Sequence, residues 1–131
     1  MFMRKDPEIE YLLLNYPAGH WDFPKGRIEK GETEIETARR EIKEETDISK
    51  IEIFEEFKKS IEYHYKAYGE LVEKTVTFFL AESFSYEVKI SSEHKDYKWL
   101  NYDDALNKIT YKNSSGILGM AANHIDNYIK P

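Results

Sequence analysis

Glutamate is concentrated in one short stretch of the chain, residues 29–45, which holds seven of them. Glu44 and Glu45 follow Glu41 by three and four residues, the spacing at which helical side chains share one face. Like charges at this spacing destabilise a helix, so a positive partner is expected between them. Carboxylate oxygens are hard ligands that suit Mg²⁺ or Mn²⁺, ions that bridge to substrate phosphates and activate water. The spacing predicts metal-assisted attack on a phosphate ester or anhydride.

The loop before this stretch supplies two further candidates, Lys25 and Gly26. Glycine has no side chain, so the backbone of Gly26 can approach a metal or a phosphate closely. Lys25 offers a mobile point charge for a phosphate. Taken alone, an acidic helix is more often a solvated face than a metal site, so the assignment depends on the spacing of the residues around it.

That spacing is specific. From Gly26, five residues lead to Glu32 and seven more lead to Arg40, after which EIKEETDI follows. The series resembles the Nudix box, G-x5-E-x7-R-E-U-x-E-E-x-G-U, in which U is an aliphatic residue. Its last glycine alone departs, replaced here by Asp47. Glycine there would end the helix in a left-handed conformation, which Asp tolerates better than most residues, so we expect the exchange to cost at most about 1 kcal/mol.

The resemblance implies an α/β/α sandwich with a mixed β-sheet, which hydrolyses a nucleoside diphosphate linked to another moiety with Mg²⁺ or Mn²⁺ as cofactor. The metal ligands that it implies are Glu41, Glu44, Glu45 and the carbonyl of Gly26. It gives Arg40 and Glu32 supporting roles, in which Arg40 orients a neighbouring carboxylate through charge-assisted hydrogen bonds.

Further segments resemble the Nudix enzymes that cleave diadenosine tetraphosphate asymmetrically. They are HWDFPKGRIEKGE, KTVTFFLAE, SSEHKDYKWL and ITYKN. This resemblance implies that Glu93 approaches the metal from outside the box and that Phe78 and Tyr111 sandwich an adenine ring. Glu93 read alone is equally an exposed loop acid. Phe78 is equally a core residue, because Phe78 and Phe79 point to opposite faces of a strand.

Other residues are candidates for contact with the phosphate chain. They are His94, Lys58 and Tyr63, together with Lys25. A lone loop histidine is more often solvated, and Lys58 and Tyr63 are equally ordinary strand surface. For the proton of the attacking water, Glu44 and Glu93 are the two candidate general bases, and the sequence does not choose between them.

Several functions share these residues. The implied reaction cleaves diadenosine tetraphosphate to ATP and AMP. The box is equally compatible with a 5′-end RNA pyrophosphohydrolase or an enzyme acting on damaged nucleotides or nucleoside sugars. A non-catalytic nucleotide-binding module is a further alternative, although it would not need the complete carboxylate set. A purely structural interaction domain is the last, and it predicts no stabilisation by Mg²⁺ with a nucleotide.

Composition sets the outer limits. The chain has 131 residues, enough for a single domain (1–131), with a net charge of −6 and no cysteine. The absence of cysteine excludes disulfides, thiolate zinc sites and cysteine nucleophiles. The negative charge argues against a stable nucleic-acid complex, since such binding depends on basic patches. No apolar run approaches membrane-spanning length, so we expect a cytoplasmic monomer that acts on a dinucleoside polyphosphate or another nucleotide.

The elements expected to position these residues are strands interleaved with three helices. Thr33 and Glu36 form a capping-box pattern that starts a helix over Thr33–Thr46. Asn101 is expected to cap a short helix over Tyr102–Lys108, and Ser114 or Ser115 to cap the last helix. The expected strands are Met1–Arg4, Ile9–Tyr16, Ile51–Phe57, Ser60–Lys66, Lys74–Glu82, Val88–Ser91 and Tyr97–Leu100. We predict a mixed sheet with helices on both faces.

Overall fold

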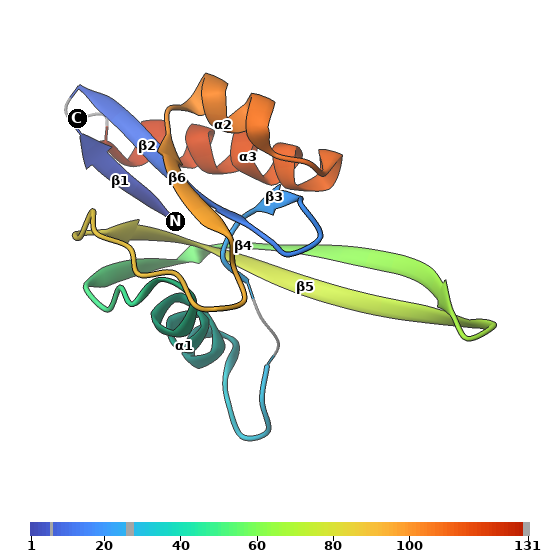
Figure 1. Cartoon of the computed structure of the whole chain (residues 1–131). Coiled ribbons are helices and arrows are strands. Elements are labelled where there is room, and N and C mark those ends of the chain that lie inside the picture. Colours follow the sequence, from blue (N-terminus) through green and yellow to red (C-terminus); the bar gives the residue numbers. More distant parts are fainter. Residues whose placement is uncertain (6, 26–27, 130–131) are drawn as a thin grey trace.

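The computed structural model of the chain describes residues 1–5, 7–25 and 28–129, apart from the side chains at positions 63, 65, 74 and 129. These residues form a six-stranded mixed sheet, with helix α1 (Glu34–Thr46) on one face and helices α2 (Tyr102–Lys108) and α3 (Lys112–Ile129) on the other (Figure 1). The strands are β1 (Phe2–Lys5), β2 (Glu8–Asn15), β3 (Trp21–Asp22), β4 (Ile51–Ala67), β5 (Glu70–Ser83) and β6 (Asp96–Leu100). The expected α/β/α sandwich is confirmed.

Strand β2 lies at the centre of the sheet, whose order is β3-β2-β1-β5-β4 with β6 also paired to β2. Its side chains alternate between the two layers of core. Tyr11 and Leu13 pack with α3, while Leu12 and Leu14 pack with the end of α1. All four are buried, so the strand is covered on both faces.

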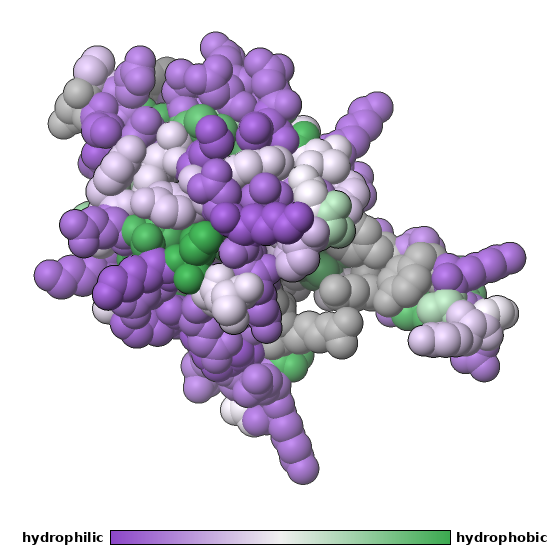
Figure 2. Space-filling model, in the orientation of Figure 1, coloured by the Kyte–Doolittle hydropathy of each residue, from purple (hydrophilic) through white to green (hydrophobic). Residues whose placement is uncertain are grey.

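Strands β4 and β5 form one long hairpin, where two separate segments, Ile51–Phe57 and Ser60–Lys66, were expected on the first side. The register shifts between Phe54 and Lys58, which marks a β-bulge. The bulge places both Phe54 and Phe57 in the core, at 4% exposure each, and this interrupts the alternation of the sequence without ending the strand. The two strands are joined by a turn at Tyr68 and Gly69, both at positive φ, and the far end of the hairpin projects from the body of the molecule (Figures 1 and 2).

Both ends of α1 are capped as expected. The Thr33 hydroxyl accepts the N–H of Glu36, and the Glu36 carboxylate accepts the N–H of Thr33. At the other end Asp47 adopts the left-handed conformation, with φ 60° and ψ 18°. Its carboxylate also accepts a bond of 2.8 Å from Nζ of Lys43, one turn earlier.

The structure corrects two of the expected elements. No strand forms at Val88–Ser91, because its backbone bonds to the end of α1 instead: the N–H of Lys89 donates to the Thr46 carbonyl and that of Ser91 to the Glu45 carbonyl. The last helix starts at Lys112 and is not capped by Ser114 or Ser115, which both lie inside it. The cap at Asn101 is confirmed.

A short strand also forms in a segment expected to be a loop, where Trp21 and Asp22 pair with the end of β2. Among the described residues, no helix has the length and apolar character needed to cross a membrane.

Candidate active site

A groove of about 720 Å³ brings together residues from four parts of the chain, one of them the end of β2 at Tyr16 and Pro17. Helix α1 contributes Glu41 and Glu45, and the loop after β5 contributes Glu93 and His94. That loop is held here because the N–H groups of Lys89 and Ser91, earlier in the same loop, donate to the last carbonyls of α1. Lys25, in the loop after β3, also lines the groove. The structure thus assembles most of the predicted metal and phosphate residues around one space.

Glu45 is the most buried carboxylate of this groove, with 7% of the residue exposed. Its Oε2 accepts the backbone N–H of Lys25 over 3.2 Å. Burial, together with the charge of Glu41, raises the pKa of Glu45 to about 8, and Glu93 adds to the effect. Glu41 and Glu93 therefore lie close enough to oppose the ionisation of Glu45.

Arg40 organises the outer side of the same helix. Its Nη1 lies 2.7 Å from Oε1 of Glu41 and 3.1 Å from Oε2 of Glu44. Its Nε and Nη2 bind the two carboxylate oxygens of Glu32. Charge-assisted bonds of this kind fix the direction of a carboxylate, as the box implies for Arg40.

The carboxylates fit a divalent cation by their chemistry. Glu41, Glu45 and Glu93 offer only hard oxygen donors, and a cation among them would remove the repulsion that raises the pKa of Glu45. Within residues 1–5, 7–25 and 28–129 no three acidic or histidine side chains already converge on one point. The groove therefore offers suitable ligands; Glu41 is bonded to Arg40, and Glu45 to the backbone N–H of Lys25.

One of the expected metal ligands, Glu44, stands apart. The side chain of Glu44 is 57% exposed, is bonded to Arg40 and does not line the groove. Gly26 lies outside the described residues. Of the two candidate general bases, Glu93 is therefore the one that lines the groove.

The expected phosphate-binding lysines are both paired with acids. Nζ of Lys25 lies 2.9 Å from Oδ2 of Asp22, whose side chain is fully buried. Lys58 is half-exposed and lies 2.7 Å from Glu34 at the start of α1, outside the groove. The side chain of Tyr63 is not among those that the structure describes. The structure thus brings Lys25 to the site and leaves Lys58 at its periphery.

His94 is buried rather than solvated, with 7% of the residue exposed. Its Nδ1 is 2.9 Å from the Ser91 hydroxyl, and its Nε2 has no hydrogen-bond partner among the described residues. Burial lowers the pKa of His94, so the ring is neutral at pH 7. A buried nitrogen without a partner at a groove is available to a ligand.

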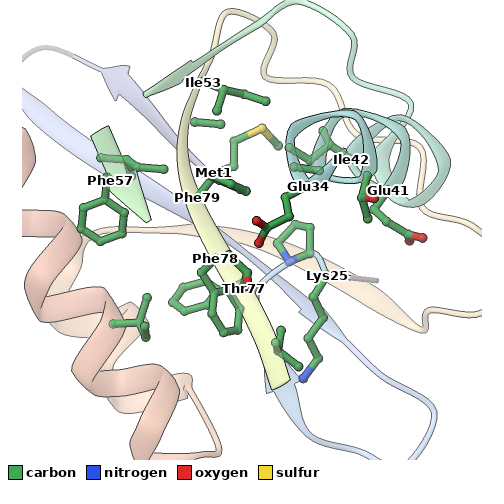
Figure 3. Close-up of a pocket in the computed structure, with 18 of the residues that line it drawn as sticks. Met1, Lys25, Glu34, Glu41, Ile42, Ile53, Phe57, Thr77, Phe78 and Phe79 are labelled. Atoms are coloured by element: carbon green, nitrogen blue, oxygen red, sulfur yellow. The ribbon is translucent and has the colours of Figure 1, made fainter. Parts of the chain in front are cut away.

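A second, larger cavity of about 950 Å³ joins the groove, because Tyr16, Lys25, Ile28 and Glu41 line both. It lies where the sheet opens, since a single register pair, Phe2 with Glu82, links the described parts of β1 and β5. Figure 3 shows the residues around it: Glu34, Glu41 and Ile42 of α1, Thr77, Phe78 and Phe79 of β5, Phe57 of β4, and Lys25. Its lining is mainly apolar, as in sites that bind organic ligands.

The two proposed base-stacking residues differ in position. Phe78 is 6% exposed, lines the larger cavity and packs edge-on against Phe23 at 5.9 Å. Tyr111 is 43% exposed and lies 5.2 Å from the ring of His20. Phe78 is thus a core residue with access to the cavity, and Tyr111 is a surface residue near the groove. Neither lies against the other in the structure, and their role in stacking stays a prediction.

Sequence reasoning missed two residues of the site, Tyr16 and Asp22. Tyr16 lines both cavities, and Asp22 is a buried carboxylate that holds Lys25. The one signal for Asp22 was a charged residue between Trp21 and Phe23, two aromatic residues that favour burial. Tyr16 gave no signal, because it follows the apolar run of β2 and reads as part of the strand.

The α/β/α sandwich and the carboxylates of its groove have the arrangement of a metal-dependent hydrolase. The NUDIX domain model matches residues 4–118, so the chain belongs to the Nudix family, whose members generally use divalent metal ions.

Similar proteins share most of the chain. It is 40% identical over 116 residues to the asymmetrical bis(5′-nucleosyl)-tetraphosphatase of Sus scrofa, covering 84% of this chain and 76% of that protein. The crystal structure of a binary complex of the Ap4A hydrolase of C. elegans superimposes with a TM-score of 0.85, at 30% identity over 96% of this chain and 93% of that one. The RNA pyrophosphohydrolase of Nitratiruptor is 35% identical over 101 residues, covering 70% of this chain and 64% of that protein.

Proposed function

We propose that this protein hydrolyses diadenosine tetraphosphate asymmetrically to ATP and AMP. The observation that carries the proposal is the junction of the two cavities, where a carboxylate groove opens into an apolar cavity large enough for a nucleoside. A polyphosphate chain would lie along the groove while a base and ribose occupy the cavity. The Sus scrofa and C. elegans enzymes, which bear this activity in their names, support the assignment.

The chemistry is an in-line displacement. Bound Mg²⁺ or Mn²⁺ would supply charge stabilisation and lower the pKa of the attacking water. Glu41, Glu45 and Glu93 would hold the ion, with the carbonyl of Gly26 and Glu44 as further ligands that the resemblance implies. The water oxygen forms a bond to a bridge phosphorus, the bond to the leaving nucleotide oxygen breaks, and a carboxylate accepts the water proton. Glu93 is the better placed base, because it lines the groove and Glu44 does not.

The remaining contacts serve the substrate. Lys25 and the free Nε2 of His94 would contact the phosphate chain from within the groove, with Lys58 and Tyr63 further out. Phe78 and Tyr111 would contact an adenine. The protein acts as a monomer in the cytoplasm and forms no stable complex with nucleic acid.

A 5′-end RNA pyrophosphohydrolase is the second candidate, favoured by the similarity to the Nitratiruptor enzyme. The two activities share the groove and differ in what lies beyond it. A triphosphorylated RNA end would place a polynucleotide where the first candidate places a second nucleoside.

Product analysis in ¹⁸O-labelled water separates the candidates. The protein is incubated with Mg²⁺ and either diadenosine tetraphosphate or a 5′-triphosphorylated oligoribonucleotide, and the products are resolved by mass spectrometry. We expect ATP and AMP, with the label in one of them, and turnover at least about 10-fold faster than on the RNA. Two ADP molecules would overturn asymmetric cleavage, and faster release of pyrophosphate from RNA would favour the second candidate. A Glu41→Gln variant controls for a contaminating enzyme.

A further inference from the structure

Tyr16 stands at the end of β2, at the boundary between the groove and the larger cavity. Its hydroxyl donates to the carbonyl of Phe23 over 2.7 Å. Phe23 lies two residues before Lys25, whose N–H donates to Oε2 of Glu45. One hydroxyl thus fixes the short segment whose backbone supports the most buried carboxylate of the site.

The ring of Tyr16 makes separate contacts. It stacks on His20 with centroids 4.8 Å apart and planes at 4°. The imidazole of His94 meets it edge-on, with centroids 4.7 Å apart and planes at 71°. Nζ of Lys25 lies 5.7 Å from the ring centroid, within the range of a cation–π contact. The ring therefore packs against two side chains of the groove, Lys25 and His94.

His94 shows why this packing matters for the site. Its Nδ1 is hydrogen-bonded to the Ser91 hydroxyl, and its Nε2 has no partner among the described residues. The direction in which Nε2 points is therefore decided by the orientation of the imidazole plane. That plane is set by Ser91 on one side and by Tyr16 on the other. A smaller side chain at position 16 would leave the imidazole free to tilt, since cores hold side chains by close packing.

We propose that Tyr16 is a positioning residue with two separable actions: its hydroxyl places the segment that supports Glu45, and its ring holds His94 toward the substrate. The second action rests on the proposed function, and the first depends only on the metal site. Groups that orient metal ligands without touching the metal commonly change its affinity 10- to 100-fold.

Two variants separate the actions. Tyr16→Phe removes the hydroxyl and keeps the ring, whereas Tyr16→Leu removes both. Tyr102→Phe is the matched control, because Tyr102 is a half-buried tyrosine on α2 that lines neither cavity. Mn²⁺ binding to the nucleotide-free protein is measured by loss of the free-ion EPR signal, and kcat, KM and Tm are measured alongside.

We expect Tyr16→Phe to weaken Mn²⁺ binding about 10-fold with an unchanged KM at saturating metal. Tyr16→Leu should also raise KM several-fold, and Tyr102→Phe should change neither. Wild-type Mn²⁺ affinity in both variants, with a fall only in Tm, would overturn the proposal and leave Tyr16 a packing residue. If the wild-type protein does not cleave diadenosine tetraphosphate but Tyr16→Phe still weakens Mn²⁺ binding, the proposed function fails and the role of the hydroxyl stands.

Discussion

Arg40 binds both carboxylate oxygens of Glu32, with Nε 2.7 Å from Oε2 and Nη2 3.1 Å from Oε1. The bonds from Arg40, with a further one from the N–H of Glu29, lower the pKa of Glu32 to about 2. The pair ties the loop before α1 to the second turn of that helix. Arg40 also reaches Glu41, so one guanidinium aligns the loop with a proposed metal ligand. Glu45 relies instead on a backbone N–H, and this difference leads to the first prediction.

The metal-free protein should lose stability as the pH rises because of Glu45. Below pH 4.5 this carboxyl is protonated in both the folded and the unfolded state; between pH 4.5 and about 8 only the unfolded state ionises, so the free energy of unfolding falls. Above pH 8 Glu45 is ionised in both states, and the free energy of unfolding falls no further on its account. In EDTA at pH 9, Glu45→Gln should therefore be more stable than wild type by at least about 1 kcal/mol, and the gain should vanish near pH 4.

Urea denaturation at several pH values measures this difference. Glu55→Gln, an exposed change on β4, is the control. Mg²⁺ should stabilise wild type more than Glu45→Gln at pH 9. Equal stability of the two proteins in EDTA at pH 9 would show that the ionised carboxylate of Glu45 does not destabilise the folded protein.

Glu93→Gln should reduce kcat more than Glu44→Gln. Glu93 lines the groove, whereas the Glu44 side chain is mostly exposed and bonded to Arg40. Loss of a general base typically costs 10²- to 10⁴-fold, so we expect about 10³-fold for Glu93 and about 10-fold for Glu44. Steady-state kinetics with diadenosine tetraphosphate at saturating Mg²⁺ gives both values. The reverse order would assign the base to Glu44.

The Asp22–Lys25 pair should show strong coupling. Lys25→Met leaves a fully buried carboxylate without its cation and should cost about 3 kcal/mol of stability at pH 7. The double variant Asp22→Asn/Lys25→Met removes both charges and should recover part of that loss. Urea denaturation of the four proteins in EDTA gives the coupling energy. If the losses of stability in the two single variants simply add in the double variant, the Asp22–Lys25 interaction contributes nothing to the free energy of unfolding.

Tyr111→Ala should weaken substrate binding, whereas Phe78→Ala should lower the stability of the fold. Tyr111 is a surface residue, so its loss should raise KM for diadenosine tetraphosphate about 10-fold and leave Tm unchanged. Phe78 is in the core, so its loss should cost about 3 kcal/mol of stability whatever its part in binding. Tyr128→Ala, a half-exposed change on α3, is the surface control. An unchanged KM in Tyr111→Ala would place the base elsewhere.

Local patterns predicted most of the fold. The cap at Thr33, the cap at Asn101 and the apolar strand β2 each depend on neighbours in the sequence, and each is confirmed. The errors arose where tertiary contacts decide. The bulge after Phe54 is stabilised by the core that it fills, and Val88–Ser91 takes its hydrogen bonds from a helix rather than from a strand.

The residues of the site also separate into those that a local pattern predicts and those that only tertiary contacts bring together. The box glutamates were found because their spacing lies within one helix. Tyr16 was missed because its role comes from a hydrogen bond to Phe23 and ring contacts with His20 and His94, which a pattern along one element does not show. The larger cavity was not predicted either, because α1, β4, β5 and α3 all contribute to its lining and no pattern along one element brings them together.

Asp47 shows what the box requires at its one divergent position. The residue has φ 60°, and its N–H closes the helix on the carbonyl of Lys43. The constraint is therefore on the turn of the backbone and not on the identity of the side chain. A sequence search that insists on glycine there would pass over this chain and over any relative that makes the same turn with Asp or Asn.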